Sequence, residues 1–158
     1  MKSNPLLVTL CICALACQPS QKKNTVRGLS PEEAMSTFEI ADGFQIEQIA
    51  AEPLIADPVD MEIDEFGRLY VVEMHGYPLD KSGSGAVKLL EDTDGDGRMD
   101  KSTIFADDLV LPTGIMRWKK GILVTDPPNV VYFEDTDGDG KADKKEIMLT
   151  GFALANPQ

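Results

Sequence analysis

The 158-residue sequence predicts an all-β fold built from two related four-stranded units. The main observation is an internal repeat, because the segment EDTDGDG begins at Glu91 and again, 43 residues later, at Glu134. The second is a series of short runs rich in Val, Ile, Leu and Tyr, separated by Gly, Pro or Asp, which is typical of strands and turns. A period of about 40–45 residues with four strands is typical of a β-propeller blade. The sequence therefore predicts a β-propeller fragment of about two blades, at residues 54–111 and 112–158.

The N-terminal residues predict a targeting signal. Lys2 precedes a twelve-residue apolar stretch, 5–16, which is too short to cross a bilayer as a helix and has the length of a signal-peptide core. The stretch ends in Ala14-Leu15-Ala16-Cys17, which resembles the lipobox of bacterial lipoproteins, although Ala14 stands where a larger aliphatic residue is usual. The alternatives are simple signal cleavage and a buried helix of the domain.

We therefore expect a lipoprotein signal peptide at residues 1–17, lipidation at Cys17, and a polar tether at residues 18–28. These features imply a cell-envelope protein, held by its lipid on a bacterial membrane and facing the periplasm or the exterior.

A short helix and a strand are predicted before the first unit. Ser30 is the expected N-cap, Pro31 the first helical residue and Glu33 the partner in a capping box, for a helix that ends at about Phe38. The alternating segment 44–50 predicts a strand. In a propeller, such an N-terminal strand commonly completes the last blade.

Each unit is predicted to contain four strands of three to six residues. The expected strands are 59–63, 68–73, 86–91 and 103–105 in the first unit, and 114–118, 121–125, 129–134 and 146–149 in the second.

Gly67 and Gly121 are predicted to supply a positive φ in the first hairpin turn of each unit. Aligning them gives an offset of 54 residues, so the first unit contains 11 extra residues, assigned to one insertion at 74–85. Two blades leave sheet faces exposed, whereas propellers have about four to eight blades. The chain is therefore expected to be the front part of a longer protein, incomplete and inactive alone.

The charge is strongly acidic, with 27 Asp and Glu against 15 Lys and Arg, for a net charge of -12. This argues against nucleic acid as a partner, because phosphate binding relies on a basic surface. All three cysteines lie in the first 17 residues, which excludes a disulfide framework in the globular part.

Nine of the acidic residues fall in the two repeated segments, which predicts calcium loops. The second segment fits the pattern D-x-[DN]-x-[DN]-G-x5-E, in which alternate carboxylates and one backbone carbonyl converge on a cation. Its expected ligands are Asp135, Asp137, Asp139, the Lys141 carbonyl, Asp143 and Glu146.

The first segment offers a less complete set, because Thr103 stands where the second has Glu146. Its expected ligands are Asp92, Asp94, Asp96, the Arg98 carbonyl and Asp100. The β pattern before each segment predicts loops between adjacent strands rather than an EF-hand. The alternative is a polar hairpin turn without metal, and the expected role of the metal is structural.

Several motifs together resemble a known family. They are Leu29-Ser-Pro-Glu-Glu-Ala34, Phe44-Gln-Ile-Glu-Gln-Ile-Ala-Ala-Glu-Pro53, Asp57-Pro-Val-Asp60, Gly67-Arg-Leu-Tyr-Val-Val-Glu73, Gly76-Tyr-Pro78 and the two EDTDGDG segments. In this order they resemble the N-terminal propeller of the membrane-bound dehydrogenases of Planctomycetes, Verrucomicrobia and Bacteroidetes. Those proteins are similar to soluble PQQ-dependent glucose/sorbosone dehydrogenases.

The resemblance covers about residues 29–158 and implies an oxidoreductase that uses PQQ and calcium on a sugar or alcohol. In that family a cytochrome domain with a CxxCH haem site often follows the propeller. This chain has no CxxCH, so no haem site is expected here.

His75, the only histidine, is the one candidate for a catalytic base. A solvent-facing or turn-bonded histidine is the alternative, and Glu73 and Tyr77 are weaker candidates for lining a pocket. Two functions therefore stay open. The first is the N-terminal part of a PQQ-dependent, dehydrogenase-like enzyme, and the second is a non-catalytic, calcium-stiffened propeller lipoprotein that binds glycan or protein.

Overall fold

The computed structural model describes residues 28–154, and residues 1–27 and 155–158 lie outside the described part. The signal peptide, the lipidated Cys17 and most of the tether fall on those residues and stay predictions. Among the described residues, no helix is long and apolar enough to cross a membrane.

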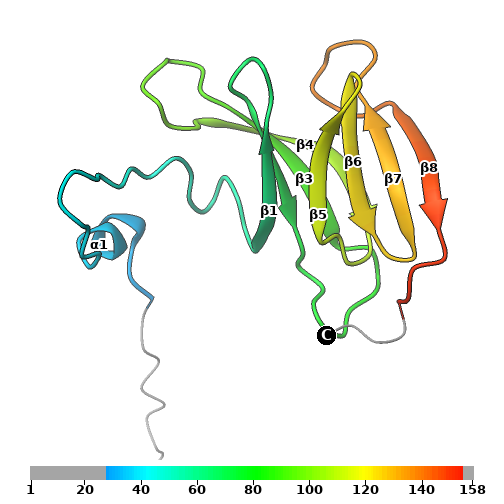
Figure 1. Ribbon diagram of the computed structural model, residues 1–158, viewed down its shortest axis with the longest axis horizontal. Coiled ribbons are helices and arrows are strands. Elements are labelled where there is room, and N and C mark those ends of the chain that lie inside the picture. Colours follow the sequence, from blue (N-terminus) through cyan, green and yellow to red (C-terminus); the bar gives the residue numbers. More distant parts are fainter. Residues whose placement is uncertain (1–27, 155–158) are drawn as a thin grey trace, which may run out of the picture.

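The described chain is nearly all β, as predicted, and forms two four-stranded antiparallel sheets side by side (Figure 1). The strand order is β1-β2-β3-β4 in the first sheet and β5-β6-β7-β8 in the second, so each sheet is a simple meander. The strands are β1 (Pro58–Ile63), β2 (Leu69–Glu73), β3 (Gly85–Glu91), β4 (Lys101–Leu109), β5 (Gly114–Trp118), β6 (Gly121–Asp126), β7 (Asn129–Glu134) and β8 (Lys144–Thr150).

All eight strands lie where the sequence predicts them, and β5 and β7 agree residue for residue. The fourth strand of each sheet is longer than expected, because β4 extends to Lys101 and Leu109 and β8 to Lys144 and Thr150. These strands lie at the sheet edge, where polar residues such as Lys101 join the ladder without burying a side chain. An apolar pattern alone therefore marks only part of them.

The predicted helix is present as α1 (Pro31–Met35), with Ser30 as N-cap and a complete capping box with Glu33. It ends about three residues earlier than expected. The amide of Thr37 already bonds to the carbonyl of Ala34, one residue closer than in an α-helix, so the last turn tightens.

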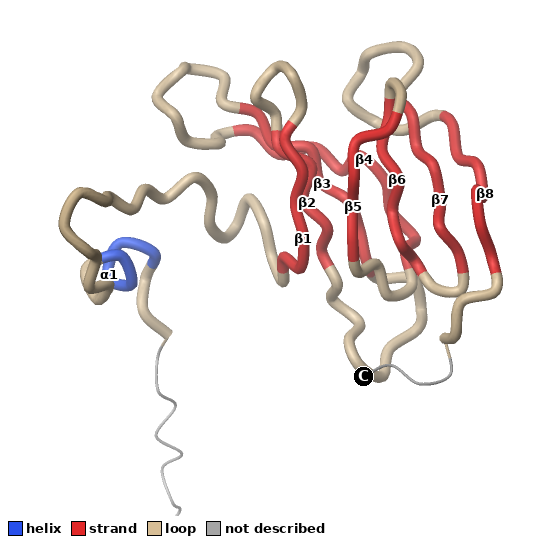
Figure 2. The backbone as a smooth tube through the Cα atoms, in the orientation of Figure 1, coloured by secondary structure: helices blue, strands red, loops and turns tan. Residues whose placement is uncertain are grey.

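The predicted strand at 44–50 is wrong for this structure. The segment is irregular and has no ladder partner among the described residues (Figure 2). Its alternating apolar residues suit a strand, but a strand forms only beside another.

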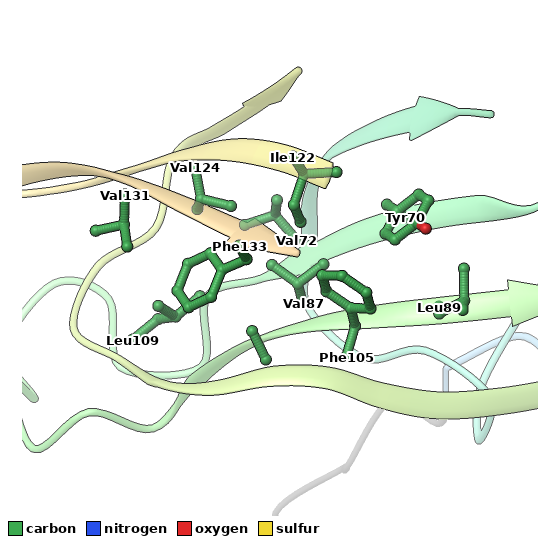
Figure 3. Packing of buried hydrophobic residues seen from close by; sticks show 11 residues of the cluster. Tyr70, Val72, Val87, Leu89, Phe105, Leu109, Ile122, Val124, Val131 and Phe133 are labelled. Atoms are coloured by element: carbon green, nitrogen blue, oxygen red, sulfur yellow. The ribbon is translucent and has the colours of Figure 1, made fainter. Parts of the chain in front are cut away.

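The core lies between the two sheets (Figure 3). It consists of Tyr70, Val72, Val87, Leu89, Phe105, Ala106, Leu109, Ile122, Val124, Val131 and Phe133. The rings of Tyr70 and Phe105 meet edge to face with centroids 5.0 Å apart. Burying each large apolar side chain contributes about 1.5–3 kcal/mol, so this cluster holds the sheets together.

The repeat can be followed in the strand registers. Leu90 of β3 and Phe133 of β7 are equivalent at the offset of 43 residues, and their ladder partners are Leu69 and Ile122. β2 and β6 therefore correspond at an offset of 53 residues rather than 54. Twelve residues separate the paired Glu73 and Ala86, whereas two separate Asp126 and Asn129. Ten of the 11 extra residues thus lie in the β2–β3 connection, and one lies in the β1–β2 turn.

Only one of the two turn glycines has the predicted role. Gly67 has a φ of +81° in the β1–β2 turn, but in the β5–β6 turn the positive φ belongs to Lys119, at +53°. Gly121 instead begins β6, where a Cβ atom would overlap the carbonyl oxygen of Phe133. This glycine is required for close approach of two strands.

Candidate metal-binding loops

The two acidic segments occupy equivalent places in the fold. Residues 92–100 connect β3 to β4, and residues 135–143 connect β7 to β8. Both loops lie at the same end of the strands (Figure 2). The prediction of loops between adjacent strands is confirmed. Strands flank both loops, so neither is part of an EF-hand.

The second loop is organised around Asp135. One carboxylate oxygen accepts the amide of Gly138 at 2.6 Å and the other accepts the amide of Gly140 at 2.9 Å. The chain turns sharply at Gly140, whose φ is +86°. Farther along, Asp139 accepts the amide of Lys141 at 2.8 Å. The backbone therefore wraps around the first carboxylate of the motif.

The first loop repeats this network. Asp92 accepts the amides of Gly95 and Gly97 at 2.7 and 2.9 Å. Asp96 accepts the amide of Arg98 at 2.8 Å. Two sequences that differ outside the EDTDGDG core thus adopt one loop structure.

A second contact closes each loop across its base. Asp143 accepts the amide of Thr136 at 3.0 Å and its hydroxyl at 2.6 Å. Asp100 accepts the same two groups of Thr93, with the hydroxyl at 2.9 Å. These aspartates therefore fix the ends of the loops.

Carboxylate oxygens converge in both loops. Asp92, Asp94 and Asp100 each place one oxygen within 4.8 Å of the others, and so do Asp135, Asp137 and Asp139. Asp96 and Asp143 lie outside these groups, as does Glu146. The structure thus brings six of the nine predicted carboxylates together, three in each loop.

Glu146 lies in β8, opposite Tyr132 in the ladder. A strand rises about 3.3 Å per residue and carries Glu146 away from the loop, whereas the helix of an EF-hand would turn it back. The carbonyls of Arg98 and Lys141 stay predicted ligands.

Hydrogen bonds lower the pKa of three of the loop aspartates. The amides of Gly97 and Gly95 hold the pKa of Asp92 below its usual value. Burial alone would raise the pKa of Asp135, but bonds from Gly140 and Gly138 outweigh it and the pKa is lowered. The Thr136 hydroxyl and amide lower the pKa of Asp143. Both loops therefore present ionised oxygens, the ligand type that calcium prefers.

Each loop also donates a hydrogen bond to the backbone of the chain segment that precedes its own sheet. The amide of Ala142 donates to the carbonyl of Phe105 in β4 at 2.8 Å. The equivalent amide in the first loop, that of Met99, donates to the carbonyl of Ile49 at 2.8 Å. The loops therefore link neighbouring layers of the fold.

His75 lies in the β2–β3 connection, at the end of the strands opposite to the acidic loops. Its Nε2 is 3.1 Å from Glu73, and its Nδ1 is 3.1 Å from Asp57. Both ring nitrogens thus face carboxylates, which matches the alternative of a turn-bonded histidine. Tyr77 is half exposed, at 50%.

Glu73 is the buried residue that the sequence analysis underrated. Its side chain is 1% exposed, and it lies 3.0 Å from the ammonium of Lys88. It also accepts the amide of Ala56 at 2.7 Å. Glu73 therefore anchors the chain that enters β1.

Asp126 is the equivalent acid in the second sheet. It accepts the amides of Val110 and Leu111, both at 2.9 Å. Burial raises the pKa of Asp126 despite these two bonds. The repeat thus places a buried acid at the end of the second strand in both sheets, a signal that a correct sequence alignment would have found.

No curated protein and no solved structure matches the chain. Residues 30–158 match the model of a family described as a domain of unknown function, DUF7133. This span contains α1, both sheets and both acidic loops. The chain therefore belongs to the DUF7133 family.

Proposed function

We propose that this chain is a calcium-binding module of a β-propeller, in which the metal stiffens the junctions between sheets. The observation that carries the proposal is the repeated network of the two loops. In each, three carboxylates converge and backbone amides wrap around the first aspartate. Without a cation, such clustered charges would repel one another.

The hydrogen bonds from each loop to the preceding layer suggest what the metal does. Ala142 immediately precedes Asp143, and its amide bonds to β4 of the other sheet. A cation that fixes the loop would also fix this contact. The metal is therefore expected to act on stability and on the packing of sheets, without taking part in a reaction.

Calcium is expected to raise the thermal stability of the chain. At a free concentration 100 times the dissociation constant, one site would add about 2.7 kcal/mol to the free energy of unfolding. Thermal unfolding is measured in calcium and in a chelator, for the parent and for Asp135→Asn and Asp92→Asn. Each variant should lose part of the calcium-dependent shift.

Asp107→Asn is the matched control, because Asp107 is exposed, lies in β4 and belongs to neither loop. It removes the same charge and should keep the full calcium shift. No stabilisation of the parent at millimolar calcium, or equal losses in the control, would refute the calcium sites.

The resemblance adds a proposal about the wider role, that of a module in a cell-envelope PQQ-dependent sugar or alcohol dehydrogenase-like oxidoreductase. The lipobox motif supports its anchoring through Cys17. One observation favours the non-catalytic alternative for this chain itself. His75, the only histidine of the sequence, has both ring nitrogens 3.1 Å from carboxylate oxygens, so both nitrogens already have polar partners in this structure.

The chain alone is accordingly expected to show no turnover. Dye reduction is measured with aldose sugars in the presence of calcium and PQQ, for the parent and for His75→Gln. Turnover by the parent that His75→Gln abolishes would show that this chain carries a catalytic centre and would overturn the non-catalytic assignment.

A further inference from the structure

The sequence contains five Asp-Gly pairs, at 42–43, 94–95, 96–97, 137–138 and 139–140. Four of them belong to the acidic loops, and the fifth lies in the segment between α1 and β1 (Figure 1). An Asp-Gly pair is chemically labile, because glycine has no Cβ to hinder attack by its own amide on the side chain before it. Whether a pair reacts depends on what its amide and its carboxylate bind in the folded chain.

In all four loop pairs, the glycine amide already has an acceptor. Both glycine amides of the first loop donate to Asp92, and both of the second loop donate to Asp135, over 2.6–2.9 Å. Each of these bonds ends on a carboxylate, which makes it stronger than a bond between neutral groups. The amide must leave that acceptor before it can reach the aspartate next to it.

The aspartate of each loop pair is bound as well. In the second loop, Asp137 accepts the amide of Asp139 at 3.2 Å, and Asp139 accepts the amide of Lys141 at 2.8 Å. In the first loop, Asp94 and Asp96 accept the amides two residues farther on in the same way. These bonds restrict the rotation that would bring a side-chain carboxyl carbon to the following amide.

The pair Asp42-Gly43 differs in both respects. Among the described residues, the carboxylate of Asp42 accepts no hydrogen bond and the amide of Gly43 donates none. Both residues are exposed, and their turn is closed by one bond, from the amide of Phe44 to the carbonyl of Ala41 at 3.1 Å. Free space does not distinguish this pair, because a Cβ on Gly43 or on Gly138 would meet nothing within 4 Å. The difference therefore lies in hydrogen bonding.

We propose that Asp42 is a site of spontaneous isomerisation to isoaspartate, and that hydrogen bonds protect the four Asp-Gly pairs of the acidic loops. In the first step, the Gly43 nitrogen attacks the side-chain carboxyl carbon of Asp42. A nitrogen–carbon bond forms, and one carboxyl oxygen leaves as water with the amide proton and a carboxyl proton. The product is a five-membered cyclic imide.

In the second step, water opens the imide. Attack on the side-chain carbonyl carbon restores aspartate. Attack on the main-chain carbonyl carbon breaks its bond to the Gly43 nitrogen, so that the chain now runs through the side-chain carbon and a carboxylate remains at the former main-chain position. The water lost in the first step is regained in the second, so no other reagent is needed. The backbone becomes one carbon longer in the turn between α1 and β1.

Peptide mapping of the aged chain tests the proposal. The full chain is incubated in neutral buffer with a chelator, so that calcium has no part in the result, and isoaspartate is located by electron-transfer fragmentation. Asp42 should isomerise at least about ten times faster than each loop aspartate, because every loop amide must first leave a bond to a charged acceptor. The same incubation in denaturing urea should bring all five pairs to similar rates.

Two variants test the cause. Asp42→Glu keeps the charge but would need a six-membered ring, so it should abolish the product at this site. Asp135→Ala removes the acceptor of two loop amides and should raise isomerisation at Asp137 and Asp139, with the first loop unchanged as an internal control. The comparison within the parent decides even if Asp135→Ala does not fold by circular dichroism. Equal rates at all five pairs in the folded parent, loop pairs that stay slow in urea, or full protection in a folded Asp135→Ala chain would overturn the proposal.

Discussion

Replacing Glu73 by alanine is expected to lower the free energy of unfolding by about 3–5 kcal/mol, the range for removing one partner of a buried ion pair. The carboxylate lies 3.0 Å from the ammonium of Lys88, whose side chain is only 19% exposed. Its removal would leave that charge without a counterion and the amide of Ala56 without an acceptor. Urea unfolding of parent and variant measures the effect.

Glu65→Ala is the matched control. Glu65 also pairs with a cation, Arg117, at 3.0 Å, but its side chain is 63% exposed. Exposed ion pairs contribute about 0–1 kcal/mol, so this variant should unfold almost like the parent. A loss in Glu73→Ala no larger than that in Glu65→Ala would contradict the anchoring role of Glu73.

The sequence does not distinguish these two glutamates, because burial depends on what packs over a strand end. The chain that covers Glu73 includes Ala56, 17 residues earlier. One signal was present, since the repeat places Asp126 at the equivalent position. Aligning Gly67 with Gly121 shifts β2 by one residue and pairs Glu73 with Pro127, which hides the shared acid.

The strands and loops were predictable for a local reason. β5 and β7 have sharp Gly, Lys, Pro or Asp boundaries, so their limits lie in the sequence itself. The Asp and Gly spacing of 135–140 likewise determines a local network of hydrogen bonds. Segment 44–50 was predicted wrongly as a strand because a strand needs a partner. Glu146 lies outside the converging carboxylates because it belongs to the strand that follows the loop.

Gly121→Ala is expected to destabilise the chain by about 3 kcal/mol, at the upper end of the usual range for overpacking. The new Cβ would overlap the carbonyl oxygen of Phe133 and lie 2.9 Å from its carbonyl carbon. These are backbone atoms of the β6–β7 ladder, so relief requires the two strands to separate. The displacement would also reach Asp135, two residues after Phe133, and lower calcium affinity.

Gly67→Ala separates this cause from ordinary turn strain. Gly67 has a φ of +81°, but a Cβ there would meet nothing within 4 Å. Its substitution should therefore cost only about 1–2 kcal/mol, the penalty of a left-handed alanine, with calcium binding unchanged. Urea unfolding and calcium titration of both variants make the comparison, and equal losses in the two would mean that close strand approach is not what requires glycine at position 121. Two glycines that look alike in the sequence would thus differ because one relieves strain in its own backbone and the other makes room for a neighbour.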